Sequence, residues 1–180
     1  MEVKISLKQL YTIEETRLLN ERFARQYSWY KPGGYFAQCL EENREGGRVT
    51  LMAYCGEELA GFCHLLYRSY YPYFRDNNIP EINDLNVFPA FRGKGIAGAL
   101  LDELETIAAR TSKSVGLGVG LYADYGNAQR LYGKRGYVMD GRGLAYANES
   151  VRPGQTVTVD DDLLLYMIKR LKIDTGAGTT

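Results

Sequence analysis

A glycine-rich stretch with two interspersed basic residues, F-R-G-K-G-I-A-G at positions 91–98, carries the strongest chemical signal in the sequence. Glycines let a backbone approach a ligand closely and adopt positive φ, and Arg92 and Lys94 add positive charge. An apolar period of four begins at Ile96, so a helix is predicted to start here, with unpaired N–H groups at its N-terminus. The stretch therefore predicts an anion site, and a pyrophosphate would suit it.

Several phosphate-binding loops combine glycines with a helix start. A Walker loop needs Lys-Ser or Lys-Thr after its glycines, and neither follows here. Gly93, Gly95 and Gly98 match the G-x-G-x-x-G of a dinucleotide-binding turn, with Asp124 downstream as a ribose ligand, but residues 89–92 separate the predicted strand from the first glycine. No parallel βαβ pattern precedes that glycine either. A plain strand-to-helix turn stays open as well, although a turn needs neither the extra glycine nor the basic pair.

Counted from Arg92, the stretch is R-x-x-G-x-A, which resembles the phosphate loop Q/R-x-x-G-x-G/A of the GNAT acyltransferase superfamily, including the V-x-P lead-in. A second segment, A-Q-R-L-Y-G-K-R-G-Y at 128–137, is similar to the family's A-x-x-L-Y-x-x-x-G-F/Y segment at the family's spacing. Where the family often has an asparagine, this chain has Tyr125, with Asn127 two residues later. The matched core spans residues 81–137, and the elements on either side also fit that fold.

The resemblance implies acetyl-CoA as the acyl donor and no metal. It places the pyrophosphate on main-chain N–H groups, with the Arg92 side chain adding charge; these groups belong to Gly93, Lys94, Gly95, Ile96 and Ala97. The pantetheine arm would pair with the strand edge from Leu85 to Val87, and the Val87 N–H would polarise the thioester carbonyl. Asn127 is a further expected cofactor contact.

The resemblance also implies direct attack of an amine on the thioester in a ternary complex. Tyr132 stands where the family places the acid that protonates the departing thiolate; with 15 tyrosines in the chain, a packing role is the alternative. An alkyl amine with a pKa of about 10.4 arrives protonated, so a base is needed. Glu81 and then Asp84 are the candidates, although each could be a solvated strand residue, and their spacing of three places them on opposite faces of a regular strand. His64 is expected to be a packed or hydrogen-bonded histidine.

The expected acceptor is a primary amine of a small molecule or peptide. The tyrosine-rich segment 67–74, with Asp76 nearby, could rim its pocket or simply shield the core. Two other functions stay open: a non-catalytic acyl-CoA-binding module of the same fold, and an NAD(P)-dependent oxidoreductase. Small enzymes of this fold often dimerise, so a homodimer is compatible with the resemblance.

The elements that must position these residues follow from periodicity and turn signals. Thr12 and Glu15 have capping-box spacing, and Gly136 is expected to close a helix at C′. Strands are predicted near 3–7, 48–55, 59–67, 81–87, 115–121, 137–140 and 162–171, and helices near 12–24, 35–43, 96–108 and 126–136. The order βααβββαβαββ predicts a mixed α/β (α+β) fold with a mostly antiparallel sheet and helices on both faces.

Composition limits the class of protein. The chain of 180 residues suits one domain, expected over 1–173 with a flexible tail at 174–180. Its 22 basic and 22 acidic residues give a formal net charge of zero, which argues against a general nucleic-acid or membrane-surface binder. The N-terminus lacks the apolar region of a signal peptide, and Cys39, Cys55 and Cys63 lack metal-type spacing, so a cytoplasmic protein with reduced cysteines is expected.

Overall fold

The computed structural model describes residues 4–172, which fall into two compact units. The first comprises residues 4–67 and 82–104, and the second residues 68–81 and 105–172. The predicted tail, 174–180, lies outside the described residues. Within the described range, no helix has the length and apolar character that crossing a membrane requires.

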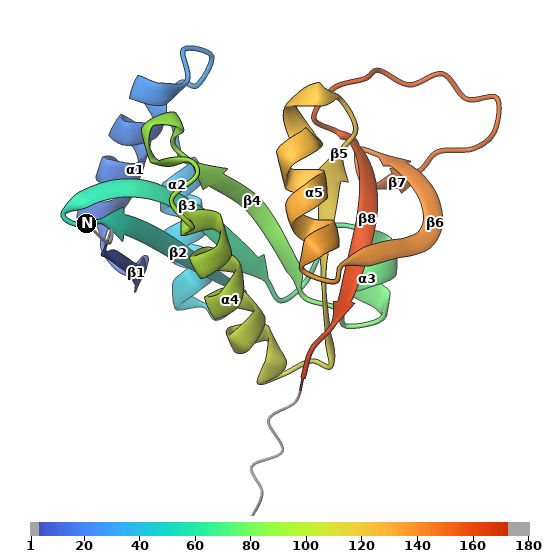
Figure 1. Ribbon diagram of the computed structural model, residues 1–180, viewed down its shortest axis with the longest axis horizontal. Coiled ribbons are helices and arrows are strands. Elements are labelled where there is room, and N and C mark those ends of the chain that lie inside the picture. Colours follow the sequence, from blue (N-terminus) through green and yellow to red (C-terminus); the bar gives the residue numbers. More distant parts are fainter. Residues whose placement is uncertain (1–3, 173–180) are drawn as a thin grey trace, which may run out of the picture. The chain divides into compact units, whose positions relative to one another are not determined.

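The elements of the first unit are four strands and three helices with one short 3₁₀ turn. In chain order these are β1 (Ile5–Gln9), α1 (Ile13–Gln26), α2 (Tyr35–Arg44), β2 (Arg48–Cys55), β3 (Glu58–Leu66), β4 (Glu81–Val87), η1 (Pro89–Phe91) and α4 (Ile96–Ala109), whose last residues belong to the second unit, as does Glu81. The strands follow the order β1-β2-β3-β4, and β1–β2 and β2–β3 are antiparallel. Figure 1 shows α1 and α2 behind these strands and α4 in front of them.

Local signals explain how α1 starts. The Glu15 N–H donates to Thr12 Oγ1 at 3.2 Å, and the Thr12 N–H donates to Glu15 Oε2 at 2.9 Å. These reciprocal bonds satisfy two N–H groups at the helix start, as the capping-box spacing predicts.

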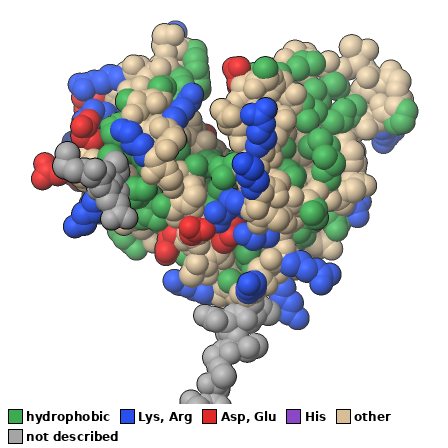
Figure 2. Space-filling view, in the orientation of Figure 1, with side chains coloured by type: hydrophobic (Ala, Val, Ile, Leu, Met, Phe, Trp, Pro, Cys, Tyr) green, Lys and Arg blue, Asp and Glu red, His purple; other side chains and the backbone are tan. Residues whose placement is uncertain are grey.

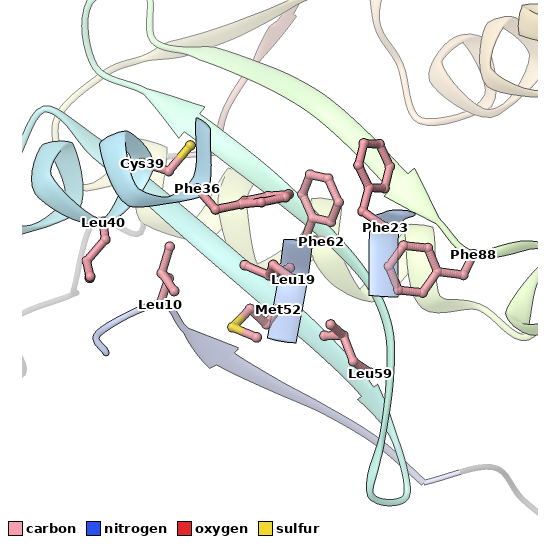
Figure 3. Packing of buried hydrophobic residues seen from close by; sticks show 10 residues of the cluster. All are labelled: Leu10, Leu19, Phe23, Phe36, Cys39, Leu40, Met52, Leu59, Phe62 and Phe88. Atoms are coloured by element: carbon pink, nitrogen blue, oxygen red, sulfur yellow. The ribbon is translucent and has the colours of Figure 1, made fainter. Parts of the chain in front are cut away.

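An aromatic-rich core joins α1 and α2 to the sheet of the first unit. Met52 and Phe62 are register partners on β2 and β3, and both side chains point toward these helices. Phe23 of α1 meets Phe62 edge-to-face, with ring centroids 5.4 Å apart. Figure 3 shows the cluster, whose members are Leu10, Leu19, Phe23, Phe36, Cys39, Leu40, Met52, Leu59, Phe62 and Phe88. Burial of these apolar surfaces is the main force that holds the unit together.

The three cysteines are free. Cys55 pairs in register with Glu58, and Cys63 pairs with Leu51, so these two cysteines are out of register with each other. Cys39 and Cys63 are buried, whereas Cys55 is partly exposed at the end of β2.

The second unit holds four strands and two helices, with one short 3₁₀ turn. These are α3 (Pro72–Asp76), β5 (Ser114–Gly120), η2 (Ala123–Tyr125), α5 (Gly126–Lys134), β6 (Val138–Tyr146), β7 (Glu149–Ser150) and β8 (Leu163–Arg170). The strand order is β5-β8-β6-β7, with every pair antiparallel. Figure 1 shows α5 in front of β5 and β8, and α3 behind them. The predicted mixed α/β fold, mostly antiparallel with helices on both faces, is confirmed.

Two features of the second unit differ from the sequence prediction. The tyrosine-rich segment 67–74 leads into the helix α3, which Phe74 anchors. A Cβ at Gly116 would lie 2.2 Å from the Phe74 ring, so the ring occupies the space that a side chain would need. The predicted strand at 137–140 continues to Tyr146 after a register shift between Met139 and Leu144. The segment between the predicted strands 137–140 and 162–171 therefore contains most of β6, and β7 as well.

Candidate functional site

The loop between β4 and α4 adopts the backbone that its glycines permit. Gly93 and Gly95 have φ values of 74° and 84°, in the left-handed region that favours glycine. The Ala99 N–H donates to the Gly95 carbonyl at 3.0 Å. The main-chain amides before Ala99 come ahead of the i→i−4 hydrogen bonds of α4. The strands before β4, which are β1, β2 and β3, pair antiparallel, so no parallel βαβ unit comes before β4 in the described residues.

The space and charge around this loop suit an anion. A Cβ at Gly93 or Gly98 would meet no atom within 4 Å, so the backbone there is open to a ligand. The first turn of α4 carries no acidic residue that would oppose the partial positive charge of the helix N-terminus. Lys94 Nζ lies 5.2 Å from the centroid of the Phe91 ring, which adds a cation-π contact beside the loop. These residues fit a pyrophosphate group.

The end of β4 is tied to this loop. Arg92 Nε donates to the Val87 carbonyl at 3.2 Å, and the Phe88 N–H donates to the Ala60 carbonyl of β3 at 2.9 Å. Leu85 and Val87, the predicted partners of the pantetheine arm, are partly buried here. The strand edge and the predicted pyrophosphate loop are therefore consecutive parts of one segment.

Asp84 interrupts the regular geometry of β4. Its φ of 51° lies in the left-handed region, which is uncommon for a residue other than glycine and is found at functional sites. Its carboxylate is 30% exposed and accepts hydrogen bonds from Tyr35 Oη at 2.7 Å and from Asn86 Nδ2. Burial acts to raise the pKa of Asp84, but the interactions with His64 and the Tyr35 hydroxyl outweigh it, and the pKa lies below its usual value.

Glu81, the other carboxylate candidate, has a different environment. Its side chain is only 4% exposed, and Ser69 Oγ donates to its Oε2. The same Ser69 oxygen accepts a hydrogen bond from the Tyr71 N–H at 2.9 Å. These contacts connect Glu81 to the start of α3, so of the two carboxylates Asp84 is the one with more solvent exposure.

Tyr132 and Asn127 lie on α5 in the second unit. Tyr132 is 7% exposed, its ring meets Tyr137 edge-to-face at 5.9 Å, and its carbonyl accepts the Tyr137 N–H. Asn127 is exposed near the start of the helix. Gly136 follows α5 with a φ of 87°, which confirms the predicted C′ position. On the face shown in Figure 2, basic side chains gather over α5.

His64 is fully buried on β3 and hydrogen-bonded, as predicted. Its Nδ1 lies 2.8 Å from Thr50 Oγ1, and its Nε2 lies 3.2 Å from Tyr35 Oη. The sequence gives no signal that Tyr35 is a partner of Asp84, because the two residues are 49 positions apart and no motif contains both.

Comparison with known proteins gives the family. A family model described as the acetyltransferase (GNAT) family matches residues 7–137. No curated protein gives a significant match to the chain. Solved structures share its fold at low sequence identity. An N-acetyltransferase from Staphylococcus aureus Mu50 has a TM-score of 0.66 at 18% identity, with 94% of this chain and 99% of that chain covered.

Two further solved structures share this fold. PaiA N-acetyltransferase from Thermoplasma acidophilum, in complex with coenzyme A, has a TM-score of 0.62 at 17% identity and covers 93% of this chain and 99% of that one. A chimera of spermidine N-acetyltransferase SpeG from Vibrio cholerae has a TM-score of 0.63 at 15% identity, with 92% and 95% covered. Because the family model matches well over half of the sequence, the chain belongs to the acetyltransferase (GNAT) family and is an acyltransferase.

Proposed function

We propose that the protein transfers an acetyl group from acetyl-CoA to a primary amine of a small molecule or peptide. The observation that carries this proposal is the β4–α4 loop, where two left-handed glycines alternate with two basic residues at a helix N-terminus. Family membership supports acetyl transfer, and the coenzyme A complex of a protein with this fold supports the donor. A spermidine N-acetyltransferase with this fold supports an amine acceptor.

Donor binding is assigned to one continuous segment. Its members are the strand edge Leu85–Val87 for the pantetheine amides, the main chain of Gly93, Lys94, Gly95, Ile96 and Ala97 for the pyrophosphate, and the Arg92 side chain for added charge. The Val87 N–H is proposed to stabilise the developing oxyanion of the thioester, and Asn127 to contact the cofactor.

The chemical roles follow from the charge states that the reaction needs. A carboxylate, or a water that it orients, removes one proton from the acceptor ammonium. The neutral amine attacks the thioester carbonyl, the C–N bond forms, and the C–S bond breaks. The Tyr132 hydroxyl then protonates the thiolate and regains a proton from the new amide nitrogen through water. One proton in total reaches the solvent.

The donor assignment is tested by thermal-shift titration with acetyl-CoA, CoA and NADPH in parallel. A ligand at 100 times its dissociation constant adds about 2.7 kcal/mol to the free energy of unfolding, which raises Tm by several degrees. We expect stabilisation by acetyl-CoA and CoA, weakened in Arg92→Ala and unchanged in Arg152→Ala, an exposed arginine outside the loop. Stabilisation by NADPH alone would overturn the proposal.

Turnover separates an enzyme from a non-catalytic acyl-CoA-binding module. Release of CoA thiol is measured with spermidine, an aminoglycoside, L-lysine and a peptide with a free N-terminus. Tyr132→Phe is expected to lower kcat on the amine that is used by about 100-fold. Tyr137→Phe is the matched control: its hydroxyl donates to Glu105 at 3.0 Å, so its loss should lower Tm and leave kcat intact. Acetyl-CoA binding without turnover on any of these amines would indicate the binding module.

A further inference from the structure

A chain of hydrogen-bonded side chains in the first unit runs from the core to Asp84. Asn43 Nδ2 lies 2.8 Å from Thr50 Oγ1, Thr50 Oγ1 lies 2.8 Å from His64 Nδ1, and His64 Nε2 lies 3.2 Å from Tyr35 Oη. Tyr35 Oη lies 2.7 Å from Asp84 Oδ2. The middle of this hydrogen-bonded chain is closed to solvent, because Thr50 and His64 are fully buried. Tyr35 and Asp84, at its outer end, are partly exposed.

The direction of each hydrogen bond follows from the carboxylate end. An ionised Asp84 can only accept, so the single Tyr35 hydroxyl proton is donated to it. The Tyr35 oxygen then has only lone pairs to offer His64, and His64 Nε2 must carry a hydrogen. The ionised Asp84 carboxylate therefore determines, through Tyr35, which nitrogen of the His64 ring carries the hydrogen.

The buried end of the chain agrees with this direction. A neutral imidazole with its hydrogen on Nε2 has a lone pair on Nδ1, which accepts the Thr50 hydroxyl proton. The Thr50 oxygen accepts from Asn43 Nδ2, which also donates to the Cys39 carbonyl at 2.6 Å. Asn43 Oδ1 accepts the Thr50 N–H at 2.8 Å. Every donor has an acceptor only if His64 is the neutral Nε2–H tautomer.

The charge states fit the same arrangement. Burial is the largest influence on His64 and lowers its pKa, so the ring is neutral at pH 7. Among the neighbouring groups, Asp84 and Glu42 act to raise the His64 pKa and Arg48 acts to lower it, and burial outweighs them. Burial raises the pKa of Cys39 to about 11 and that of Cys63 well above its usual value, while Arg48 and Glu42 form an ion pair at 2.6 Å.

We propose that Tyr35 and His64 are positioning residues that fix the orientation of Asp84, one of the two carboxylates already considered as the base for the acceptor ammonium. This inference rests on the proposed acetyl transfer. Asp84 is suited to the role because it is 30% exposed, whereas Glu81 is 4% exposed. The left-handed backbone at Asp84 fixes the main-chain end of this side chain, and the Tyr35 and Asn86 donors fix its oxygens.

The first test is the tautomer of His64, which needs no acceptor. Because the chain has a single histidine, ¹⁵N-histidine labelling gives one imidazole and an unambiguous NMR assignment. Between about pH 6 and 8 we expect a protonated Nε2 and an unprotonated Nδ1. Tyr35→Phe should change the Nε2 resonance, and Tyr146→Phe, which removes a hydroxyl bonded to Asp160 in the second unit, should not. An Nδ1–H tautomer or an imidazolium at pH 7 would overturn the chain's direction.

The second test is the pH profile of kcat/KM for acetylation of spermidine or another amine from the screen. Asp84→Asn should lower kcat by about 100-fold with little change in KM for acetyl-CoA. Tyr35→Phe removes a donor that lowers the Asp84 pKa, so the limb of the profile that reports this carboxylate should move to higher pH. Thr50→Val removes the hydroxyl that contacts His64 Nδ1 and should shift the pH profile. Thr50→Ser keeps this hydroxyl and should show the wild-type profile. The pair of variants therefore separates the loss of a hydrogen bond from a packing defect.

The outcomes distinguish the two proposals. If the wild type acetylates an amine and Tyr35→Phe leaves its pH profile in place, the positioning role is wrong and the function stands. Full activity of Asp84→Asn would likewise remove Asp84 as the base and leave the function intact. If the wild type acetylates none of the four amines, the proposed function and this inference both fall.

Discussion

The His64 ring is buried between two hydroxyl groups, one on β2 and one on α2. Because burial lowers its pKa, the folded chain binds the imidazole proton less readily than the unfolded chain, where the pKa is about 6.5. The unfolded chain therefore takes up more protons below about pH 6.5. The free energy of unfolding falls with decreasing pH in that window, until the pH reaches the folded pKa.

His64→Gln removes this titration and should flatten the dependence of Tm on pH between about pH 7.5 and 5.5. The variant should also be less stable at pH 7.5, because the amide cannot reproduce both ring hydrogen bonds. Thermal melts across this range provide the measurement, with Tyr11→Phe as a variant that should keep the wild-type slope. Equal slopes in wild type and His64→Gln would contradict the burial argument.

At the scale of elements, β3 has a glycine where β4 comes closest. A Cβ at Gly61 would lie 2.3 Å from the Asn86 carbonyl oxygen and 3.1 Å from Val87 Cα. Both atoms belong to backbone, so no side-chain rotation can relieve the clash. Any side chain at position 61 must displace the end of β4, which leads into the proposed donor site.

Gly61→Ala should therefore lower the free energy of unfolding by about 1–3 kcal/mol and weaken acetyl-CoA binding as well. Denaturant melts and the acetyl-CoA thermal shift measure the two effects separately. Gly133→Ala on α5 is the control, because its Cβ would meet no atom within 4 Å and alanine favours a helix. A normal acetyl-CoA affinity in Gly61→Ala would show that the end of β4 tolerates displacement.

Elements with strong local signals were predictable from the sequence. The Thr12–Glu15 capping box and the glycine after α5 depend on residues close in the chain, and both are present. The helix α3 has only five residues, too few for a periodic pattern, and Phe74 anchors it against residues distant in the sequence. The extension of β6 was missed because Gly141 and Gly143, with positive φ, are typical of a strand end.

The candidate site also combines a part that could be predicted from local sequence with a part that depends on distant contacts. The β4–α4 loop is a contiguous motif, so its residues and its helix start could be predicted. The partners of Asp84 could not, because Tyr35 and His64 reach it only through the pairing of β2 with β3 and the position of α2. The positive φ of Asp84 itself has no sequence signature, since one aspartate within a strand pattern does not mark a left-handed residue.

Across the whole molecule, tyrosine hydroxyls donate repeatedly to carboxylates. The pairs are Tyr35–Asp84, Tyr71–Asp140, Tyr122–Asp161, Tyr125–Asp161, Tyr137–Glu105 and Tyr146–Asp160. Burial is the largest cause of a raised pKa at Tyr35, Tyr71, Tyr125 and Tyr137, and the hydrogen bond to the carboxylate is the largest at Tyr122 and Tyr146. The folded chain therefore retains these protons at a pH where the unfolded chain has lost them.

Stability should consequently fall as the pH rises above about 10, the usual tyrosine pKa, and the phenols should ionise largely with unfolding. Ultraviolet titration of tyrosinate is the measurement, with the denatured chain as reference. We expect the native curve to be displaced to higher pH and steeper than the denatured one. Superimposable curves would mean that the hydroxyl–carboxylate pairs do not hold the phenolic protons.

The placement of the three sulfhydryls has a practical consequence for enzymology. Detection of released CoA depends on reagents that also modify protein thiols, but Cys39 and Cys63 are 1% and 0% exposed in the folded chain. Only the partly exposed Cys55 is positioned to contribute background. The same residue offers a single attachment point for a fluorophore at the β2–β3 turn, away from the cysteines of the interior. Modification beyond one equivalent would then report unfolding directly.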